Sequence, residues 1–317
     1  MSTTVLSPVT GKEGVRGYSK IESRAIIELY KKQLGVDVSS VFDGLPEVDV
    51  MECVQTGYRF YYPFRLAGNA AFYEELQEKM TGNTAYYRGW GYDHAFALAK
   101  VQPGQAILDV GCGSGNFLER ARQISDKVSG LEFNEKAINE ARRKGLDVKN
   151  ESIEKYAATN PGRYDMVCLF QVLEHIDNIK PFLEAVISVV KPGGQLIIGV
   201  PNNDPWLHGY HKYNTLNLPP HHMGLWNKQV FEKIQDVFGI KLAEVKYDGS
   251  ESLRLDMYYR AKLWWGIKSE LQFHTKLEKL KLLLAAPFAF FPSVYRKFTR
   301  GLSARYIVVV FEKKSSL

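Results

Sequence analysis

Two groups of residues in this sequence have the types and the spacing that ligand binding and proton transfer require. The first is the segment DVGCGSG at 109–115, where an apolar strand pattern runs into glycines at alternate positions. Such glycines let the backbone turn tightly and approach a ligand at the N-terminus of the following helix. The second is a set of three histidines, His175, His221 and His222, since an imidazole can accept a proton near neutral pH.

A carboxylate follows the glycine loop at the distance expected of a ribose-binding residue. Glu132 comes 23 residues after Asp109, in the segment SGLEFN at the end of a second strand pattern. An acidic side chain about 20 positions beyond such a loop can accept both ribose hydroxyls. The alternative is that the glycines form only a turn and that Glu132 is a solvated strand end.

The histidines stand after two further strand patterns. His175 lies in VLEHI at 172–176, and His221 and His222 lie in LPPHHMGLW at 218–226. Either position is close to the edge of the sheet where a ligand of the glycine loop would sit. The alternatives are that His175 anchors its loop and that the histidine pair packs within a loop or caps the next helix.

The elements that must position these residues alternate between short apolar runs and amphipathic stretches. Near-continuous apolar strands with helices between them indicate a parallel sheet that is covered on both faces. The predicted strands are 106–110, 127–132, 147–150, 164–170, 195–200, 241–247 and 306–311. The predicted helices between them are 116–122, 134–143, 181–190 and 227–238, with Asn134 as an N-cap.

Four segments in this order carry a family resemblance. ILDVGCGSGNFLE, GLEFN, YDMVCLFQVLEHI and KPGGQLIIGVPN resemble the class I S-adenosylmethionine-dependent methyltransferases, and the chain is similar to the small-molecule branch typified by the ubiquinone-biosynthesis O-methyltransferases. The resemblance covers roughly 85–247 and the last strand. It implies a Rossmann-like α/β fold, with a seven-stranded, mostly parallel sheet and helices on both faces.

The resemblance also implies a set of S-adenosylmethionine-binding residues. Those around the methionine moiety would be Asp109, Gly111, Cys112, Gly113 and Gly115. Glu132 would hold the ribose. Ser152 and Ile153 would flank the adenine, although many relatives carry Asp in place of Ser152. The remaining candidates are Phe170 and Gln171, at the end of a strand, and Tyr86, which precedes the loop.

A motif that the sequence lacks narrows the chemical class of the methyl acceptor. The strand at 164–170 continues as QVLEH and lacks the Asn/Asp-Pro-Pro-Tyr/Phe stretch carried by methylases of exocyclic base amines and glutamine amides. A hydroxyl oxygen of a small-molecule or glycan-like acceptor is therefore favoured, while carbon and other nitrogen acceptors stay open. The sequence leaves two other functions open. One is a catalytically inactive cofactor-binding scaffold or regulator. The other is an NAD-dependent oxidoreductase, disfavoured by the G-x-G-x-G spacing and the lack of a Tyr-x-x-x-Lys pair.

The sequence divides into an N-terminal extension (1–84) and a methyltransferase domain (85–317) with a helical insertion (251–300). The extension is rich in aromatic residues and has helical stretches near 21–33 and 70–80. Two of its segments, SPVTG at 7–11 and CVQTG at 53–57, look like remnants of C-x-x-C-G knuckles or are chance turns. With Ser7, Thr10 and Thr56 in three of the four ligand positions, no zinc is expected.

The net charge of +6, from 41 basic and 35 acidic residues, lacks the strong basic excess of a dedicated nucleic-acid binder, so no nucleic-acid partner is expected. Three cysteines make no disulfide framework, and no close Cys/His set offers a metal site. A cytoplasmic protein without a signal peptide or membrane span is expected. Nine basic and two acidic residues fall between Arg260 and Arg300. The insertion could therefore be a lid, a peripheral contact with anionic lipid at the inner face of the membrane, or a structural cap.

Overall fold

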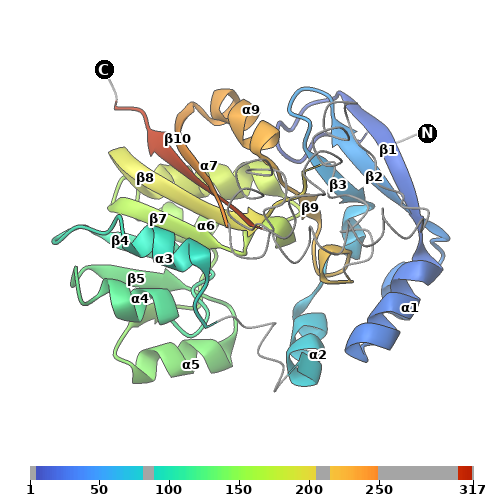
Figure 1. Cartoon of the computed structure of the whole chain (residues 1–317), viewed down its shortest axis with the longest axis horizontal. Helices are drawn as coiled ribbons and strands as arrows, with labels where there is room; N and C mark the ends of the chain where they lie inside the picture. The colour runs from blue at the N-terminus through green and yellow to red at the C-terminus, as the bar shows by residue number, and fades with distance from the viewer. Residues whose placement is uncertain (1–4, 81–88, 205–214, 249–305, 316–317) are drawn as a thin grey trace, which may run out of the picture.

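The computed structural model describes residues 5–80, 89–204, 215–248 and 306–315 (Figure 1). Within these ranges a seven-stranded sheet has the order β10-β11-β8-β7-β4-β5-β6. The strands are β4 (Ile107–Val110), β5 (Val128–Leu131), β6 (Asp147–Lys149), β7 (Tyr164–Phe170), β8 (Val190–Pro201), β10 (Ile240–Tyr247) and β11 (Tyr306–Lys313). Strands β4 to β8 pair in parallel, and β11 lies antiparallel between β8 and β10. The predicted fold class is confirmed.

Helices cover both faces of this sheet because successive strand residues point to opposite sides. On β11, for example, Val309 belongs to one core and Val310 to the other. One face packs against α6 (Ile153–Ala157), α7 (Ile179–Val189) and α9 (Lys228–Phe238). The other packs against α3 (Tyr92–Leu98), α4 (Asn116–Ala121) and α5 (Glu135–Arg143). The Asn134 side chain caps α5 as predicted, accepting the Ala137 N–H at 3.0 Å.

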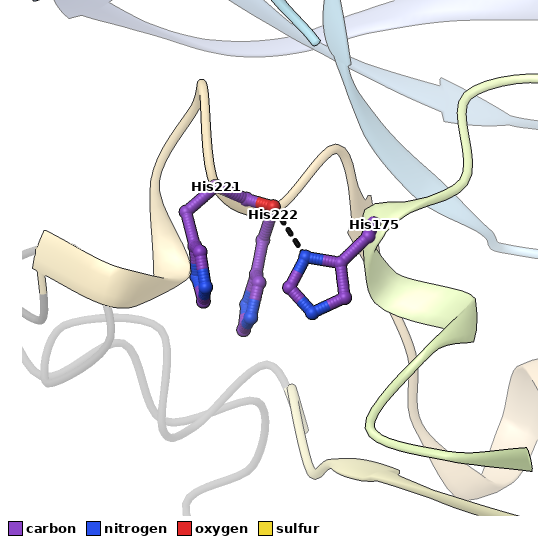
Figure 2. Close-up of side chains that lie close together, drawn as sticks. All are labelled: His175, His221 and His222. Carbon is purple, nitrogen blue, oxygen red and sulfur yellow. Dashed lines mark hydrogen bonds between the residues drawn. The ribbon is translucent and has the colours of Figure 1, made fainter. Parts of the chain in front are cut away.

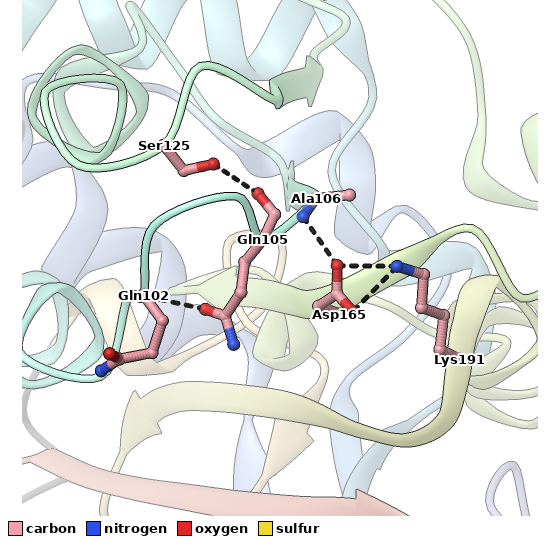
Figure 3. Close-up of polar contacts among 6 residues, drawn as sticks. All are labelled: Gln102, Gln105, Ala106, Ser125, Asp165 and Lys191. Atoms are coloured by element: carbon pink, nitrogen blue, oxygen red, sulfur yellow. Dashed lines mark hydrogen bonds and ion pairs between the residues drawn. The ribbon is translucent and has the colours of Figure 1, made fainter.

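At the end of the sheet away from the glycine loop, a partly buried carboxylate, Asp165, holds neighbouring strands together (Figure 3). Asp165 accepts the Ala106 N–H at 2.8 Å and forms an ion pair with Lys191 at 2.8 Å. Burial raises the pKa of Asp165, but the hydrogen bonds from Lys191 and Ala106 outweigh this and leave the pKa below its ordinary value. These bonds join the beginnings of β4, β7 and β8. Strand β8 starts at Val190, five residues earlier than predicted, with a register irregularity opposite β7.

The N-terminal residues form a second, four-stranded antiparallel sheet (Figure 1). Its order is β1 (Val15–Glu22), β2 (Glu47–Cys53), β3 (Arg59–Tyr62) and β9 (Gly224–Leu225). The two helices beside it, α1 (Ser23–Leu34) and α2 (Ala70–Met80), correspond to the predicted helical stretches, whereas the strands were not predicted. Strand β9 follows β8 in the sequence, far from the other three strands of this sheet. It therefore joins the segment that carries His221 and His222 to the N-terminal sheet.

The two knuckle-like turns lie together in the structure. Ser7, Thr10, Cys53 and Thr56 are all buried. The hydroxyl oxygens of Ser7 and Thr56 accept the N–H groups of Thr10 and Tyr58. Burial raises the pKa of Cys53, but hydrogen bonds from Ser7 and Thr56 outweigh this and hold the pKa below its usual value. Hydrogen bonds thus link the four positions, and the absence of zinc stays a prediction.

Two of the predicted features fall outside the described residues. They are Tyr86 and the basic insertion 251–300, so their predicted roles stay predictions. In the parts of the chain that the structure describes, every helix is too short or too polar to cross a bilayer.

Candidate active site

The glycine loop leaves β4 at the carboxyl edge of the parallel strands, where the order of the sheet reverses between β4 and β7. Gly111, Gly113 and Gly115 all have positive φ angles of 78°, 54° and 76°, which side chains rarely adopt. A Cβ at Gly111 would lie 2.4 Å from Val172 Cγ2, and one at Gly115 would lie 2.4 Å from Leu146 Cδ1. A Cβ at Gly113 would meet none of the described residues within 4 Å. The loop therefore packs at its two ends and presents open backbone at its middle.

Glu132 lies directly against this open part of the loop. Its Oε2 accepts the Gly113 N–H at 2.8 Å, and its Oε1 accepts those of Phe133 and Asn134 at 2.8 and 2.9 Å. A carboxylate offers about four acceptor sites, so these three bonds leave capacity for a ribose hydroxyl. The carboxylate is already oriented by the backbone beside the loop, which fits the predicted ribose contact.

Asp109 is buried beneath the loop. Its Oδ1 has no hydrogen-bond partner among the described residues. Burial raises the pKa of Asp109 well above its ordinary value, and the charges of Glu132 and Asp93 add to the effect. A buried polar atom without a partner is costly, so its presence under the loop is consistent with a site for a polar ligand. Together with the open backbone of Gly113, this group fits the S-adenosylmethionine predicted here.

Three other predicted cofactor contacts, Cys112, Ser152 and Ile153, have packing or capping roles in the structure. Cys112 packs beneath the glycine loop, where the absence of a side chain at Gly130 makes room for its Sγ. Ser152 caps α6 by accepting the Lys155 N–H at 3.3 Å, and Ile153 is buried as the first residue of that helix. Capping is one physical reason for a serine at this position.

At the end of β7, Phe170 and Gln171 connect the loop region to α3. The Phe170 ring packs on Phe117 and His94, with centroids 5.0 and 4.6 Å away. Gln171 has a φ angle of 56°, which is unusual for a residue with a side chain, and its Nε2 donates to Asp93 Oδ2 at 3.1 Å. Non-glycine residues with such positive φ angles tend to occur at functional sites.

Sequence reasoning did not single out Asp93 or His94, which both come from α3. Gly199 in β8 makes room for the Asp93 side chain, because a Cβ there would lie 2.8 Å from Asp93 Cβ. Burial lowers the pKa of His94. A glycine within an apolar strand indicates such a close approach, so Gly199 was the available signal.

The three predicted histidines lie together, although two come from a different loop than the third (Figure 2). The rings of His221 and His222 are stacked with centroids 4.5 Å apart. The His175 ring stands at a steep angle to both, at 4.6 and 4.8 Å. This cluster is beside the glycine loop, because Val172, three residues before His175, packs against Gly111.

The hydrogen bonds of the cluster define which nitrogen of each ring carries a proton. Nδ1 of His175 lies 2.6 Å from the His221 carbonyl oxygen, and Nδ1 of His221 lies 2.7 Å from that of Leu216. Nδ1 of His222 lies 3.0 Å from the side-chain oxygen of Asn217. A carbonyl oxygen only accepts, so each Nδ1 donates, and Nε2 carries the lone pair of the neutral ring.

Burial keeps two of these rings neutral. It lowers the pKa of His175 to about 4, and it lowers the pKa of His221 well below its ordinary value, to which the neighbouring His175 adds. Both side chains are therefore neutral at pH 7 and are weaker bases than a solvated histidine.

Two further groups at the cluster were not predicted. The Tyr73 hydroxyl, from α2, donates to the His221 carbonyl oxygen at 3.1 Å and lies 3.2 Å from His175 Nδ1. Glu174 is fully buried, and neither carboxyl oxygen has a hydrogen-bond partner among the described residues. Burial raises the pKa of Glu174 to about 8, so the side chain is neutral at pH 7. A charged residue between Leu173 and His175, directly after an apolar strand, was the signal for Glu174.

The histidines also bear on the expected absence of a metal. Their ligand atoms lie within 4.8 Å of one another, whereas the sequence offered no close set of such residues. The loops thus bring together ligand types that are far apart along the chain, and the absence of a metal stays a prediction to be tested.

Known proteins resemble this chain in sequence and in fold. Residues 83–245, about half of the chain, match a family described as methyltransferase domain. A ubiquinone biosynthesis O-methyltransferase from Thiobacillus denitrificans is 36% identical over 107 residues, 32% of this chain and 46% of the relative, so the matched part spans under half of that protein. One from Xanthomonas campestris is 26% identical over 189 residues, covering 52% and 79%.

Among solved structures, the chain is similar in fold to one in the complex between the Haloferax volcanii Trm112 methyltransferase activator and a methyltransferase. The TM-score is 0.50 at 17% identity, covering 75% of this chain and 94% of that one.

Proposed function

The chain belongs to the methyltransferase domain family, and on that premise we propose that it transfers a methyl group from S-adenosylmethionine to a hydroxyl oxygen of a small-molecule or glycan-like acceptor. The observation that carries the proposal is the histidine cluster beside the glycine loop. Its imidazole nitrogens can accept a proton, and Val172, three residues before His175, connects the cluster to the loop by packing against Gly111.

In this proposal the chain's residues hold the cofactor, orient the acceptor and remove the proton of its hydroxyl group. The Gly113 backbone would lie against the methionine moiety of the cofactor and Glu132 would bind its ribose, and the bound cofactor would supply a methyl group on a positively charged sulfur. Transfer is an in-line displacement, so its rate depends on alignment of the acceptor and on removal of its proton. The bound cofactor would supply the methyl group and retain its sulfur as a neutral thioether, and a histidine Nε2 would accept the hydroxyl proton as the oxygen–methyl bond forms.

Of the three histidines, we assign proton acceptance to His222. Burial makes His175 and His221 weak bases, and their Nδ1–H groups donate to backbone carbonyls, of which the His221 carbonyl, bound by His175, joins the two loops. His222 instead donates to a side chain, that of Asn217. The orientation of the His222 ring therefore does not depend on the hydrogen bond between the two loops. We propose that His175 and His221 line the acceptor side of the site.

The proposal is tested by titrating the purified protein calorimetrically with S-adenosylmethionine, S-adenosylhomocysteine and NAD. Transfer from methyl-labelled cofactor to phenols, catechols and sugars is then followed by mass spectrometry. Binding of the first two ligands and labelled methyl ethers would support it. Binding of NAD alone would overturn it, transfer to carbon or nitrogen would overturn the oxygen assignment, and binding without transfer would favour a scaffold.

Replacing Glu132 by alanine is expected to weaken S-adenosylmethionine binding by about 10–100-fold, because hydrogen bonds to a charged group contribute roughly 1.5–3 kcal/mol. Calorimetric titration measures the change in Kd. The matched control is Glu135→Ala, which removes an exposed carboxylate three residues away in the first turn of α5. Equal affinities for the wild type and Glu132→Ala would contradict the ribose assignment.

Removal of divalent metal is expected to leave methyl transfer unchanged, because the proposed chemistry uses only histidine as the base. The measurement compares initial rates before and after dialysis against EDTA, with metal content determined by elemental analysis. A loss of activity on chelation that zinc or magnesium restores would show that the three histidines, or other residues, hold an ion.

A further inference from the structure

A chain of buried polar groups leads from His222 to the N-terminal sheet. His222 Nδ1 donates to Asn217 Oδ1 at 3.0 Å, and Asn217 Nδ2 donates to Asn203 Oδ1 at 2.8 Å. The backbone oxygen of Asn203 accepts a hydrogen bond from Arg59 Nη2. None of these four residues is more than 6% exposed. Buried polar groups are costly unless they are hydrogen-bonded, and a connected network of them fixes one arrangement of side chains.

The hydrogen bonds of this chain have a defined direction. Asn203 Nδ2 donates to the Pro201 carbonyl oxygen at 3.3 Å, so its Oδ1 faces Asn217 as an acceptor. Asn217 must then present its amide nitrogen to Asn203 and its oxygen to His222. An amide oxygen cannot donate, and His222 Nδ1 therefore carries the proton.

The N-terminal sheet holds both asparagines from one strand, β3. The Tyr61 hydroxyl donates to the Asn217 backbone oxygen at 3.0 Å, while Arg59 binds the Asn203 backbone. The Arg59 guanidinium also packs over the Tyr18 ring at 5.0 Å. The backbone of β3 pairs with β9, which follows His222 by two residues. The asparagines are therefore anchored to the sheet that borders the histidine loop.

From this arrangement we propose that Asn217 is a positioning residue for methyl transfer, held in place by Asn203 and Arg59. It keeps a proton on His222 Nδ1 and so leaves Nε2 as the nitrogen that faces the acceptor hydroxyl. This rests on the proposed function, which makes His222 the proton acceptor. Neither asparagine is expected to touch the acceptor or the cofactor.

The proposal is tested by nitrogen NMR of the protein labelled with ¹⁵N-histidine, since the two neutral tautomers have distinct nitrogen shifts. Signals of His222 are assigned by their loss in His222→Gln. The wild type is expected to show His222 with the proton on Nδ1. In Asn217→Leu the Nδ1 donor loses its acceptor, so the Nε2-protonated tautomer is expected to become substantial. For the same reason kcat should fall about 10–100-fold, the usual cost of losing a group that orients a functional histidine, while KM stays within about threefold.

Two other variants separate positioning from structural damage. Asn217→Asp keeps an oxygen acceptor for His222, so Nδ1 is expected to remain protonated even if Asn217→Leu does not fold. Thr215→Val is the matched control, because Thr215 lies in the same turn and its buried hydroxyl donates to Gln33 Oε1 at 2.7 Å. That variant should change neither the tautomer nor kcat.

The outcomes distinguish this proposal from the proposed function. A wild-type His222 with its proton on Nε2 would overturn it, as would an unchanged tautomer in Asn217→Leu or an equal change in Thr215→Val. If no acceptor is ever methylated, the proposed function fails while the NMR result still decides whether Asn217 orients His222. If the tautomer changes but kcat does not, the positioning role in catalysis is overturned.

Discussion

Replacing His222 by glutamine is expected to lower kcat about 10²–10⁴-fold, which is the usual contribution of a positioned general base. Glutamine fills a similar volume and retains a polar amide but has no basic nitrogen. The Kd of S-adenosylmethionine should stay within about twofold, because His222 is not among the residues proposed to bind it. Single-turnover rates with saturating cofactor and calorimetric Kd values provide the two measurements.

The neighbouring ring supplies the control for this experiment. His221 is stacked on His222, yet its Nδ1 donates to the Leu216 backbone and burial lowers its pKa far below its ordinary value. His221→Gln should therefore lower kcat by less than His222→Gln. If the two variants lose activity equally, or if His222→Gln is fully active, the assignment of the base is wrong.

Glu174→Gln is expected to change how protein stability depends on pH. The carboxyl group has a pKa of about 8 in the folded protein, because it is buried, and an ordinary value of 4.5. Between these values the folded state binds a proton that the unfolded state has lost, so wild-type stability decreases as pH rises from about 5 to 8. Glutamine has no such proton. Its stability relative to wild type should therefore increase by on the order of 4–5 kcal/mol over this range.

Urea unfolding at a series of pH values measures this difference. Glu184→Gln is the control, since Glu184 is half exposed on α7 and pairs with Lys180 at the helix surface. Its stability curve should run parallel to that of the wild type within about 0.5 kcal/mol. A Glu174→Gln curve that also runs parallel to the wild type would show that the Glu174 carboxyl is not held neutral by burial.

Most of the central sheet was predictable from the sequence because its signals are local. Buried parallel strands such as β7 read as continuous apolar runs, and the glycine loop and the Asn134 cap mark where elements begin and end. The beginning of β8 differs because residues 191–194 contain proline and glycine, which predict a turn, yet their backbone still pairs within the sheet.

The N-terminal sheet was not predictable in the same way. Strand β1, with the sequence VRGYSKIE, has a mixed pattern, and β3 and β9 are only four and two residues long. Their pairing depends on partners that are distant in the sequence. Local patterns consequently predicted helices α1 and α2 but gave no signal for the sheet beside them.

At the site, residue types could be identified from the sequence, but their mutual geometry could not. The three histidines were candidates because of their chemistry and their place after strands. Their convergence, the burial that lowers the pKa of His175, and the contact of Tyr73 with this ring all arise from tertiary packing. Asn217 lies five residues before His222, a spacing without a recognisable motif.

The pairing of β3 with β9 also constrains how the protein is made. Residues 59 and 225 meet in this sheet, so its last strand leaves the ribosome more than 160 residues after its third. At ~5–20 residues per second this interval is roughly 8–30 s. During that time the edge of β3 has no strand to pair with, while the parallel sheet is still being synthesised. Residues 59–62 of a nascent chain therefore have one unpaired strand edge, open to chaperones and to mispairing, until the histidine loop emerges and adds β9 to the sheet.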